Sequence, residues 1–236
     1  MSISVSDLIS VCGINLFVSR EEIILKYRKD FKKRDISPPK LISPLTKEEK
    51  KKNTDDGNKS ESVYLSKIAK TIVSSSSESS SDDFYIPIVS SSSSSSLSST
   101  ESSSSSSNEE IILTKICSDQ ESYKKDGITG RVDAIIEENN EKIILELKKS
   151  TKEILPWHTL VYPTYITQCQ MYIYLTGIEK AKLVRFDDYG NEKFIYLEKD
   201  DEIINKMLEV KESLFSAECI DDVLIYDNLP RKYYFN

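Results

Sequence analysis

The chain has 236 residues, of which 38% are hydrophobic and 30% charged, and its formal net charge is −7. This length accommodates one domain with a hydrophobic core and extensions, and the acidic total argues against a protein that coats nucleic acid through charge alone. No apolar run reaches the roughly 20 residues of a membrane helix, and the N-terminus lacks the basic region of a signal peptide. We therefore expect an intracellular protein of the nucleus or cytoplasm with no membrane partner.

The first 73 residues are predicted to be a helical part with a basic segment. Helical spacing of apolar residues predicts helices over 5–14, 20–34 and 58–73. Between them, residues 26–52 carry eleven Lys/Arg against four Asp/Glu. This segment is either a contact for a phosphate backbone or an ordinary solvated face or import patch.

Residues 74–108 consist mostly of serine and are predicted to be a disordered insertion, because such a tract cannot bury enough apolar surface to offset its ordering entropy. Residues 109–236 then form the core of the domain. Their patterns predict, in chain order, strands over 109–117, 129–138 and 141–149, a helix over 163–177, a hairpin of 181–188 and 193–201, and a helix over 201–217.

Two of these elements have clear boundaries. Pro163 is expected to open the first helix and Gly177 to close it. The second helix is amphipathic, and its inward residues are predicted to be Ile203, Ile204, Met207, Leu208 and Leu214. Strands alternating with helices indicate an α/β fold.

The segment 130–150 places two acids and a lysine inside apolar runs. If Asn139 and Asn140 form a two-residue hairpin loop, the register is fixed, because asparagine tolerates the positive φ that such loops need. Asp133 and Glu146 then lie directly opposite each other on one face, with Cβ atoms about 5 Å apart. Lys148 projects to the same side.

Two carboxylates held this close repel each other, and a hard divalent cation, Mg²⁺ or Mn²⁺, relieves the repulsion. The ammonium of Lys148 is then positioned to orient a water molecule or to neutralise a phosphate. The alternative is an exposed hairpin whose outer face carries charged residues without a function.

These residues resemble the PD-(D/E)XK nuclease superfamily, and more closely its RecB-type and lambda-exonuclease-like (YqaJ-type) branches. In "GxxGRVD…IILELKK", Gly130 and Asp133 match a strand with a glycine before an aspartate, here spaced as G-x-x-D, and Glu146 and Lys148 match the ExK strand that follows it. The similarity covers about residues 109 to 215. Two further motifs match, namely Q-x-x-x-Y at Gln168 and Tyr172, and G-x-x-x-E at Gly57 and Glu61.

The resemblance implies a restriction-endonuclease-like core, with a central mixed sheet flanked by helices, and metal-dependent hydrolysis of DNA phosphodiester bonds. It further implies an exonuclease in DNA repair, recombination or replication. Asp133, Glu146 and the carbonyl of Leu147 would hold one or two Mg²⁺ ions, and Lys148 would position the water. Gln168 and Tyr172 would brace the site or contact DNA, with Glu61 as a further acid.

The remaining reactive residues have ordinary expected roles. The four cysteines are far apart and are expected to be reduced thiols, with no iron–sulfur cluster. His158, the single histidine, is expected in a loop or at the surface. The sequence leaves open whether the protein forms a homo-oligomer. Two alternatives to an active nuclease also stay open: a catalytically silent fold that binds nucleic acid or protein, and a mostly disordered interaction protein.

Overall fold

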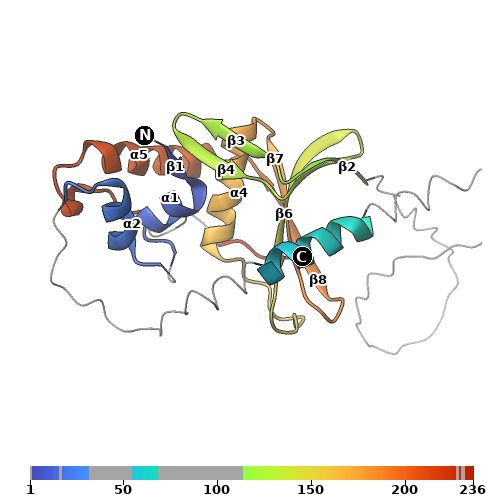
Figure 1. Ribbon diagram of the computed structural model, residues 1–236. Coiled ribbons are helices and arrows are strands. Elements are labelled where there is room, and N and C mark those ends of the chain that lie inside the picture. The colour runs from blue at the N-terminus through green and yellow to red at the C-terminus, as the bar shows by residue number, and fades with distance from the viewer. Residues whose placement is uncertain (1, 16–17, 32–54, 69–113, 227–228, 230–231) are drawn as a thin grey trace, which may run out of the picture.

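Figure 1 shows the computed structural model, which describes residues 2–15, 18–31, 55–68, 114–226, 229 and 232–236. The predicted disordered insertion, 74–108, and most of the basic segment lie outside these residues. The elements in chain order are β1 (Ile3–Ser4), α1 (Val5–Val11), α2 (Arg20–Tyr27), a helix of residues 55–68, β2 (Thr114–Asp119), β3 (Ser122–Lys125), β4 (Ile128–Arg131), β5 (Ala134–Glu138), β6 (Glu141–Lys149), α4 (Pro163–Thr176), β7 (Lys180–Phe186), β8 (Glu192–Glu198), α5 (Asp201–Ser216) and a short 3₁₀ helix (Ile220–Asp222).

The centre of the fold is a five-stranded sheet in the order β2-β5-β6-β7-β8. The pair β6–β7 is parallel and the other neighbouring pairs are antiparallel, so the sheet is mixed. The parallel pair needs a crossover connection, and α4 provides it. The predicted class, α/β with a central mixed sheet flanked by helices, is confirmed.

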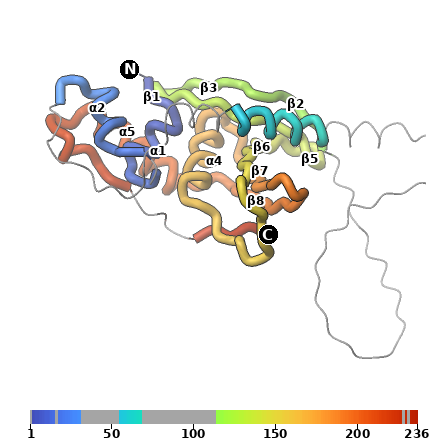
Figure 2. Tube along the Cα trace, turned by 60° about the horizontal axis from the view of Figure 1, so that its bottom comes forward, coloured from blue at the N-terminus to red at the C-terminus, as the bar shows by residue number. Residues whose placement is uncertain are grey.

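Helices cover both faces of this sheet (Figures 1 and 2). On one face, α4 lies against the strands, with α1, α2 and α5 beyond it, and together they form the larger hydrophobic core. On the other face, the helix of residues 55–68 buries Leu65 in a smaller core with Ile136, Leu145 and Val184. Val63, one of the apolar residues behind the predicted helix, is 65% exposed.

A second, three-stranded sheet in the order β1-β4-β3 was not predicted. Its hairpin turns at Asp126 and Gly127, whose φ angles of 48° and 73° suit a two-residue Asp-Gly loop. β1 adds to β4 in parallel and so ties the N-terminus to the core.

The single strand predicted over 129–138 is wrong: it is divided into β4 and β5, which belong to different sheets. The division falls at Val132 and Asp133. The Val132 N–H donates to the Glu121 carbonyl, and the Gln120 N–H donates to the Asp133 carbonyl. The side-chain alternation changes phase at this point, because Val132 belongs to the larger core and Ala134, two residues later, to the smaller one.

The two long helices α4 and α5 agree closely with prediction. Pro163 is the first residue of α4, and Gly177 ends it with φ of 74°. In α5 the predicted inward residues are buried, except that Leu208 is only partly buried, and Val210 is buried as well. Among the described residues, no helix combines the length and hydrophobicity needed to cross a membrane.

Candidate active site

The hairpin of β5 and β6 turns at Asn139 and Asn140, as predicted, with φ angles of 50° and 65°. Pairing runs from Glu138↔Glu141 to Ala134↔Leu145 and ends there. Asp133 therefore lies one residue beyond the ladder, which corrects the expectation that it faces Glu146 within paired strands. Instead, its Oδ2 accepts a hydrogen bond of 2.7 Å from the Leu147 N–H.

The side chains of β6 alternate between the two cores. Ile143, Leu145 and Leu147 belong to the smaller core, and Ile144 belongs to the larger one. Glu146 follows the face of Ile144 and is only 1% exposed. The alternative of an exposed hairpin with an incidental charged face is therefore wrong.

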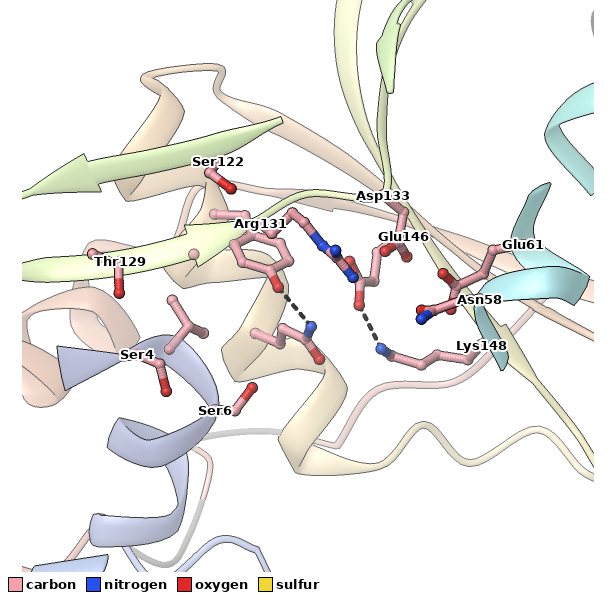
Figure 3. A pocket seen from close by; sticks show the side chains of 14 residues that line it. Ser4, Ser6, Asn58, Glu61, Ser122, Thr129, Arg131, Asp133, Glu146 and Lys148 are labelled. Carbon is pink, nitrogen blue, oxygen red and sulfur yellow. Dashed lines mark hydrogen bonds and ion pairs between the residues drawn. The ribbon is translucent and has the colours of Figure 1, made fainter. Parts of the chain in front are cut away.

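All six side chains predicted for the site line one open cavity of about 400 Å³ (Figure 3). They come from the helix of residues 55–68, the segment between β4 and β5, β6 and α4: Glu61, Asp133, Glu146, Lys148, Gln168 and Tyr172. In Figure 3, Glu61 extends from its helix toward Asp133 and Glu146. The fold thus brings together residues that are more than one hundred positions apart in the sequence.

Sequence reasoning missed several other lining residues, among them Ser4, Ser6, Asn58, Ser122 and Thr129. Asn58 lies three residues before Glu61, and this helical spacing could have indicated it. The serines from β1 and α1 had no signal, because only the pairing of β1 with β4 brings the N-terminus to the cavity.

Among the described residues, only one of the two carboxylate oxygens of Glu146 has a hydrogen-bond partner. Its Oε1 accepts a hydrogen bond from Lys148 Nζ at 2.5 Å. Its Oε2 is buried and has no hydrogen-bond partner among the described residues. Burial raises the pKa of Glu146 to about 8, and the nearby charge of Asp133 adds to the rise. The cavity therefore contains a carboxyl group with an unused acceptor oxygen.

The pKa values of the two neighbouring acids are shifted in the same direction. Burial raises the pKa of Asp133 despite the opposing charge of Lys148. Burial also raises the pKa of Glu61, and the charge of Asp133 raises it further. Three carboxyl groups from separate elements thus disfavour each other's ionisation, which is the condition that a bound cation relieves.

Lys148 remains a cation in this site. Burial lowers its pKa, but the charges of Glu146 and Asp133 outweigh burial, and the pKa is raised overall. Its Nζ also lies 5.3 Å from the centre of the Tyr165 ring, within the range of a cation–π contact. An ammonium with a raised pKa donates hydrogen bonds and does not act as a base.

Close approach of α4 to β4 explains the glycine of the G-x-x-D segment. A Cβ atom at Gly130 would lie 2.8 Å from Tyr172 Cε1 and 2.8 Å from Leu175 Cδ1. The absence of this atom lets Tyr172 reach the cavity, where its hydroxyl accepts a hydrogen bond of 2.8 Å from Gln168 Nε2. The Q-x-x-x-Y pair therefore forms one hydrogen-bonded unit.

The donor set fits a hard divalent cation. Among the described residues, Glu146 Oε2 has no hydrogen-bond partner, and the bond from the Leu147 N–H engages only Oδ2 of Asp133. In an extended strand the N–H and C=O of one residue point to the same edge, so the Leu147 carbonyl points to the edge where Asp133 lies. Within the described residues, no group of three or more His, Cys, Asp or Glu side chains is arranged to hold a metal. Two carboxylates and a backbone carbonyl form a donor set that suits Mg²⁺, which typically takes one or two carboxylates and completes its shell with water and phosphate.

The single histidine and the four cysteines do not line this cavity, although the buried Cys169 thiol interacts electrostatically with Glu146, Lys148 and Asp133. His158 is in the loop between β6 and α4, as predicted. The four cysteines are free: Cys12 and Cys169 are buried, and Cys117 and Cys219 are exposed.

No protein-family model matches the sequence, and no curated protein matches it. Among solved structures, the fold is similar to an alkaline exonuclease, LHK-Exo, from Laribacter hongkongensis, with a TM-score of 0.45 and 12% identity over 91% of this chain and 86% of that chain. It is also similar to a phage-related exonuclease from Haemophilus somnus 129PT, with a TM-score of 0.46 and 13% identity over 94% of each chain. At TM-scores this low, the similarity carries no argument about function.

Proposed function

We propose that this protein is a metal-dependent nuclease that hydrolyses phosphodiester bonds of DNA and acts as an exonuclease. The observation that supports this most is the convergence of Asp133, Glu146 and Lys148 in one cavity, with a buried Glu146 oxygen that has no hydrogen-bond partner in the described part of the chain. The motif resemblance to PD-(D/E)XK nucleases of the lambda-exonuclease-like branch, which requires these three residues, agrees with this geometry.

In the proposed reaction, Asp133, Glu146 and the Leu147 carbonyl would hold Mg²⁺ or Mn²⁺. The bound ion would polarise the scissile phosphate and lower the pKa of a water molecule. Lys148, which stays protonated, donates hydrogen bonds to the phosphate oxygens or the attacking water and stabilises the negative charge that develops. Glu61 is positioned to bind a further water molecule beside Asp133.

Gln168 and Tyr172 are proposed as positioning residues. The bond between them fixes both side chains at the wall of the cavity. Burial raises the pKa of Tyr172, so its hydroxyl keeps its proton at neutral pH. The pair can therefore donate to an oxygen of the sugar–phosphate backbone without changing its charge.

The test uses end-labelled single- and double-stranded DNA, the purified full-length protein, and Mg²⁺, Mn²⁺ or EDTA. Wild type is expected to release short products from an end only when a metal is present. Asp133→Ala is expected to reduce cleavage to background. Lys148→Ala should reduce it by about 10²–10³-fold, the usual loss of one charge-stabilising donor.

Two exposed residues of the same hairpin provide matched controls. Glu141→Ala and Lys142→Ala likewise remove one carboxylate and one ammonium, but outside the cavity, and should leave cleavage unchanged. The proposal is wrong if purified, folded Asp133→Ala and Lys148→Ala both retain robust metal-dependent cleavage.

A catalytically silent fold that binds nucleic acid is the second candidate. The observation in its favour is that Lys148 already pairs with Glu146, so part of the buried charge is compensated without a metal. This candidate predicts no thermal stabilisation by Mg²⁺ or Mn²⁺ relative to EDTA. The nuclease proposal predicts stabilisation, because a ligand that binds only the folded state raises its stability.

A further inference from the structure

A row of three cations crosses the sheet from the candidate active site. Lys148 on β6 pairs in register with Arg185 on β7, and Arg185 pairs with Lys193 on β8. Residues that are paired across neighbouring strands lie on the same face, so all three side chains extend from the face that carries Glu146. Neighbouring strands are about 4.8 Å apart, so the row spans about 10 Å.

The loop between β6 and α4 lies over the far end of this row. Lys193 Nζ donates to the Pro156 carbonyl, and Arg185 donates to the Ser150 hydroxyl. The next residue, Trp157, is 71% exposed. Figures 1 and 2 show this loop, in yellow, at the same end of the molecule as the C-terminus.

Backbone bonds to the C-terminal residues hold the loop in place. The Val161 N–H donates to the Tyr233 carbonyl, and the Phe235 N–H donates to the Thr159 carbonyl. Because these bonds fix the loop, the exposed Trp157 side chain is already positioned to contact a ligand.

Two aromatic rings, those of Tyr162 and Tyr165, connect the loop to Lys148 in the candidate active site. Tyr162 is 52% exposed, and its ring centre lies 5.4 Å from that of Tyr165. Tyr165 in turn lies beneath the Lys148 ammonium. The cation row and the ring pair of Tyr162 and Tyr165 therefore both start at Lys148 and both reach the loop, the row at Pro156 and the ring pair at Tyr162.

We propose that the cation row and the aromatic loop form a track that holds an unpaired DNA strand beside the active site. Phosphates of the strand lie along Arg185 and Lys193, and bases stack on Trp157 and Tyr162. Positive grooves lined with aromatic side chains bind single strands in this way, since every base offers a ring face. The inference rests on the proposed nuclease function for the identity of the strand and adds the form of the substrate: an unpaired end.

Trp157 is the only tryptophan of the chain, so its fluorescence reports on this loop alone. In EDTA, where no cleavage is expected, a dT oligomer of about ten nucleotides should quench this fluorescence on binding to the full-length protein. An abasic strand of the same length should bind through its phosphates without quenching. Trp157→Ala should weaken binding of the dT oligomer about tenfold, measured by fluorescence anisotropy of a labelled strand.

The cation row is tested by salt dependence. Arg185→Ala and Lys193→Ala should each reduce the slope of log affinity against log salt by about 0.7, the value for one phosphate contact on a single strand. Lys206→Ala on α5 and Ile225→Ala, both exposed and outside the track, are the matched controls and should bind as wild type does.

Binding without quenching, unchanged salt slopes in both cation variants, or no binding of the dT oligomer would each overturn the track. The outcomes are independent of the proposed reaction. Metal-dependent cleavage without quenching rejects the track and keeps the nuclease. Quenching with the expected salt slopes, but without cleavage in Mg²⁺ or Mn²⁺, supports the track and rejects the nuclease.

Discussion

Two buried glutamates of the same hairpin, Glu138 and Glu146, form ion pairs with lysines and yet differ in their surroundings. Glu138 is 5% exposed, and both its oxygens have partners: Lys182 at 2.8 Å and the Tyr196 hydroxyl at 2.6 Å. Glu146 is 1% exposed and pairs with Lys148, but its second oxygen has no partner among the described residues.

The difference shows that neither burial nor an ion pair by itself identifies a functional carboxylate. A buried pair whose hydrogen bonds are all made is a structural unit, since leaving any of its groups unpaired is costly. Burying Glu146 Oε2 without a hydrogen-bond partner among the described residues costs free energy. A ligand that pairs with this oxygen is therefore favoured. Glu138 therefore serves as the internal control for every experiment on Glu146.

The largest expected effect is on catalysis. Glu146→Gln keeps the size of the side chain and removes its charge, so metal-dependent cleavage of labelled DNA should fall by about 10³-fold or more. Glu138→Gln should cleave as wild type does. Equal activity in the two variants would remove the functional distinction between the glutamates.

Stability should respond in the opposite order. Glu138→Ala leaves Lys182 partly buried without its partner and should lower the free energy of unfolding by about 3 kcal/mol. Glu146→Gln should cost less in EDTA, because the amide oxygen of the glutamine can still accept the hydrogen bond from Lys148 Nζ. Urea unfolding measures both. Glu141→Ala, which breaks the exposed pair with Lys180, should cost about 0.5 kcal/mol or less.

The raised pKa of Glu146 predicts a smaller effect, which is a change of folding stability with pH. The folded protein keeps a proton on Glu146 that the unfolded chain releases above pH 4.5, until the pKa of about 8 in the folded state is passed. Stability in EDTA should therefore fall as pH rises from 4.5 to 8, by up to about 1.4 kcal/mol per pH unit from this group. The raised pKa values of Asp133 and Glu61 act in the same direction.

Glu146→Gln should flatten this decline in urea unfolding measured across the pH range, whereas Glu138→Gln should retain it because Glu146 is intact. Adding Mg²⁺ at pH 8 should restore stability, since the cation binds the ionised carboxylates. A wild-type protein whose stability rises with pH in EDTA would contradict the assignment of Glu146 as a carboxyl group with a raised pKa.

The smallest effects are expected at the two tyrosines. Tyr172→Phe removes the acceptor of the Gln168 hydrogen bond and should cost about 1 kcal/mol of stability, with a several-fold loss of cleavage. Tyr196→Phe removes a donor to Glu138 and should also cost about 1 kcal/mol or somewhat more, with cleavage unchanged. Parallel unfolding and cleavage measurements check the pair; loss of cleavage in Tyr196→Phe would extend the functional region to the other face of the sheet.

Local patterns predicted the elements that carry most of the site. Asn139 and Asn140 placed the hairpin loop, and alternation along β6 assigned Glu146 and Lys148 to one face. The proline and glycine at 163 and 177 placed α4, which holds Gln168 and Tyr172. Each of these predictions depends on residues close together in the chain, where backbone preference and period decide the structure.

Elements with distant partners escaped prediction. The Asp126–Gly127 turn was a readable hairpin signal that the strand prediction overlooked. The short β1 and the change of sheet at Val132 were not readable, because they depend on which backbone groups pair. Asp133 leaves the ladder for the same reason and meets Leu147 through its side chain.

The sequence by itself determined the chemistry available to this protein: two acids and a lysine at a spacing that one hairpin brings together. The motif resemblance indicated Glu61, but only the tertiary structure brings its side chain to the same cavity and leaves one Glu146 oxygen without a partner among the described residues. The tertiary structure also decided that Arg185 and Lys193 continue the row from Lys148. Spacing along a strand or helix fixes which side chains share a face, whereas burial and pairing depend on segments that meet only when the chain folds.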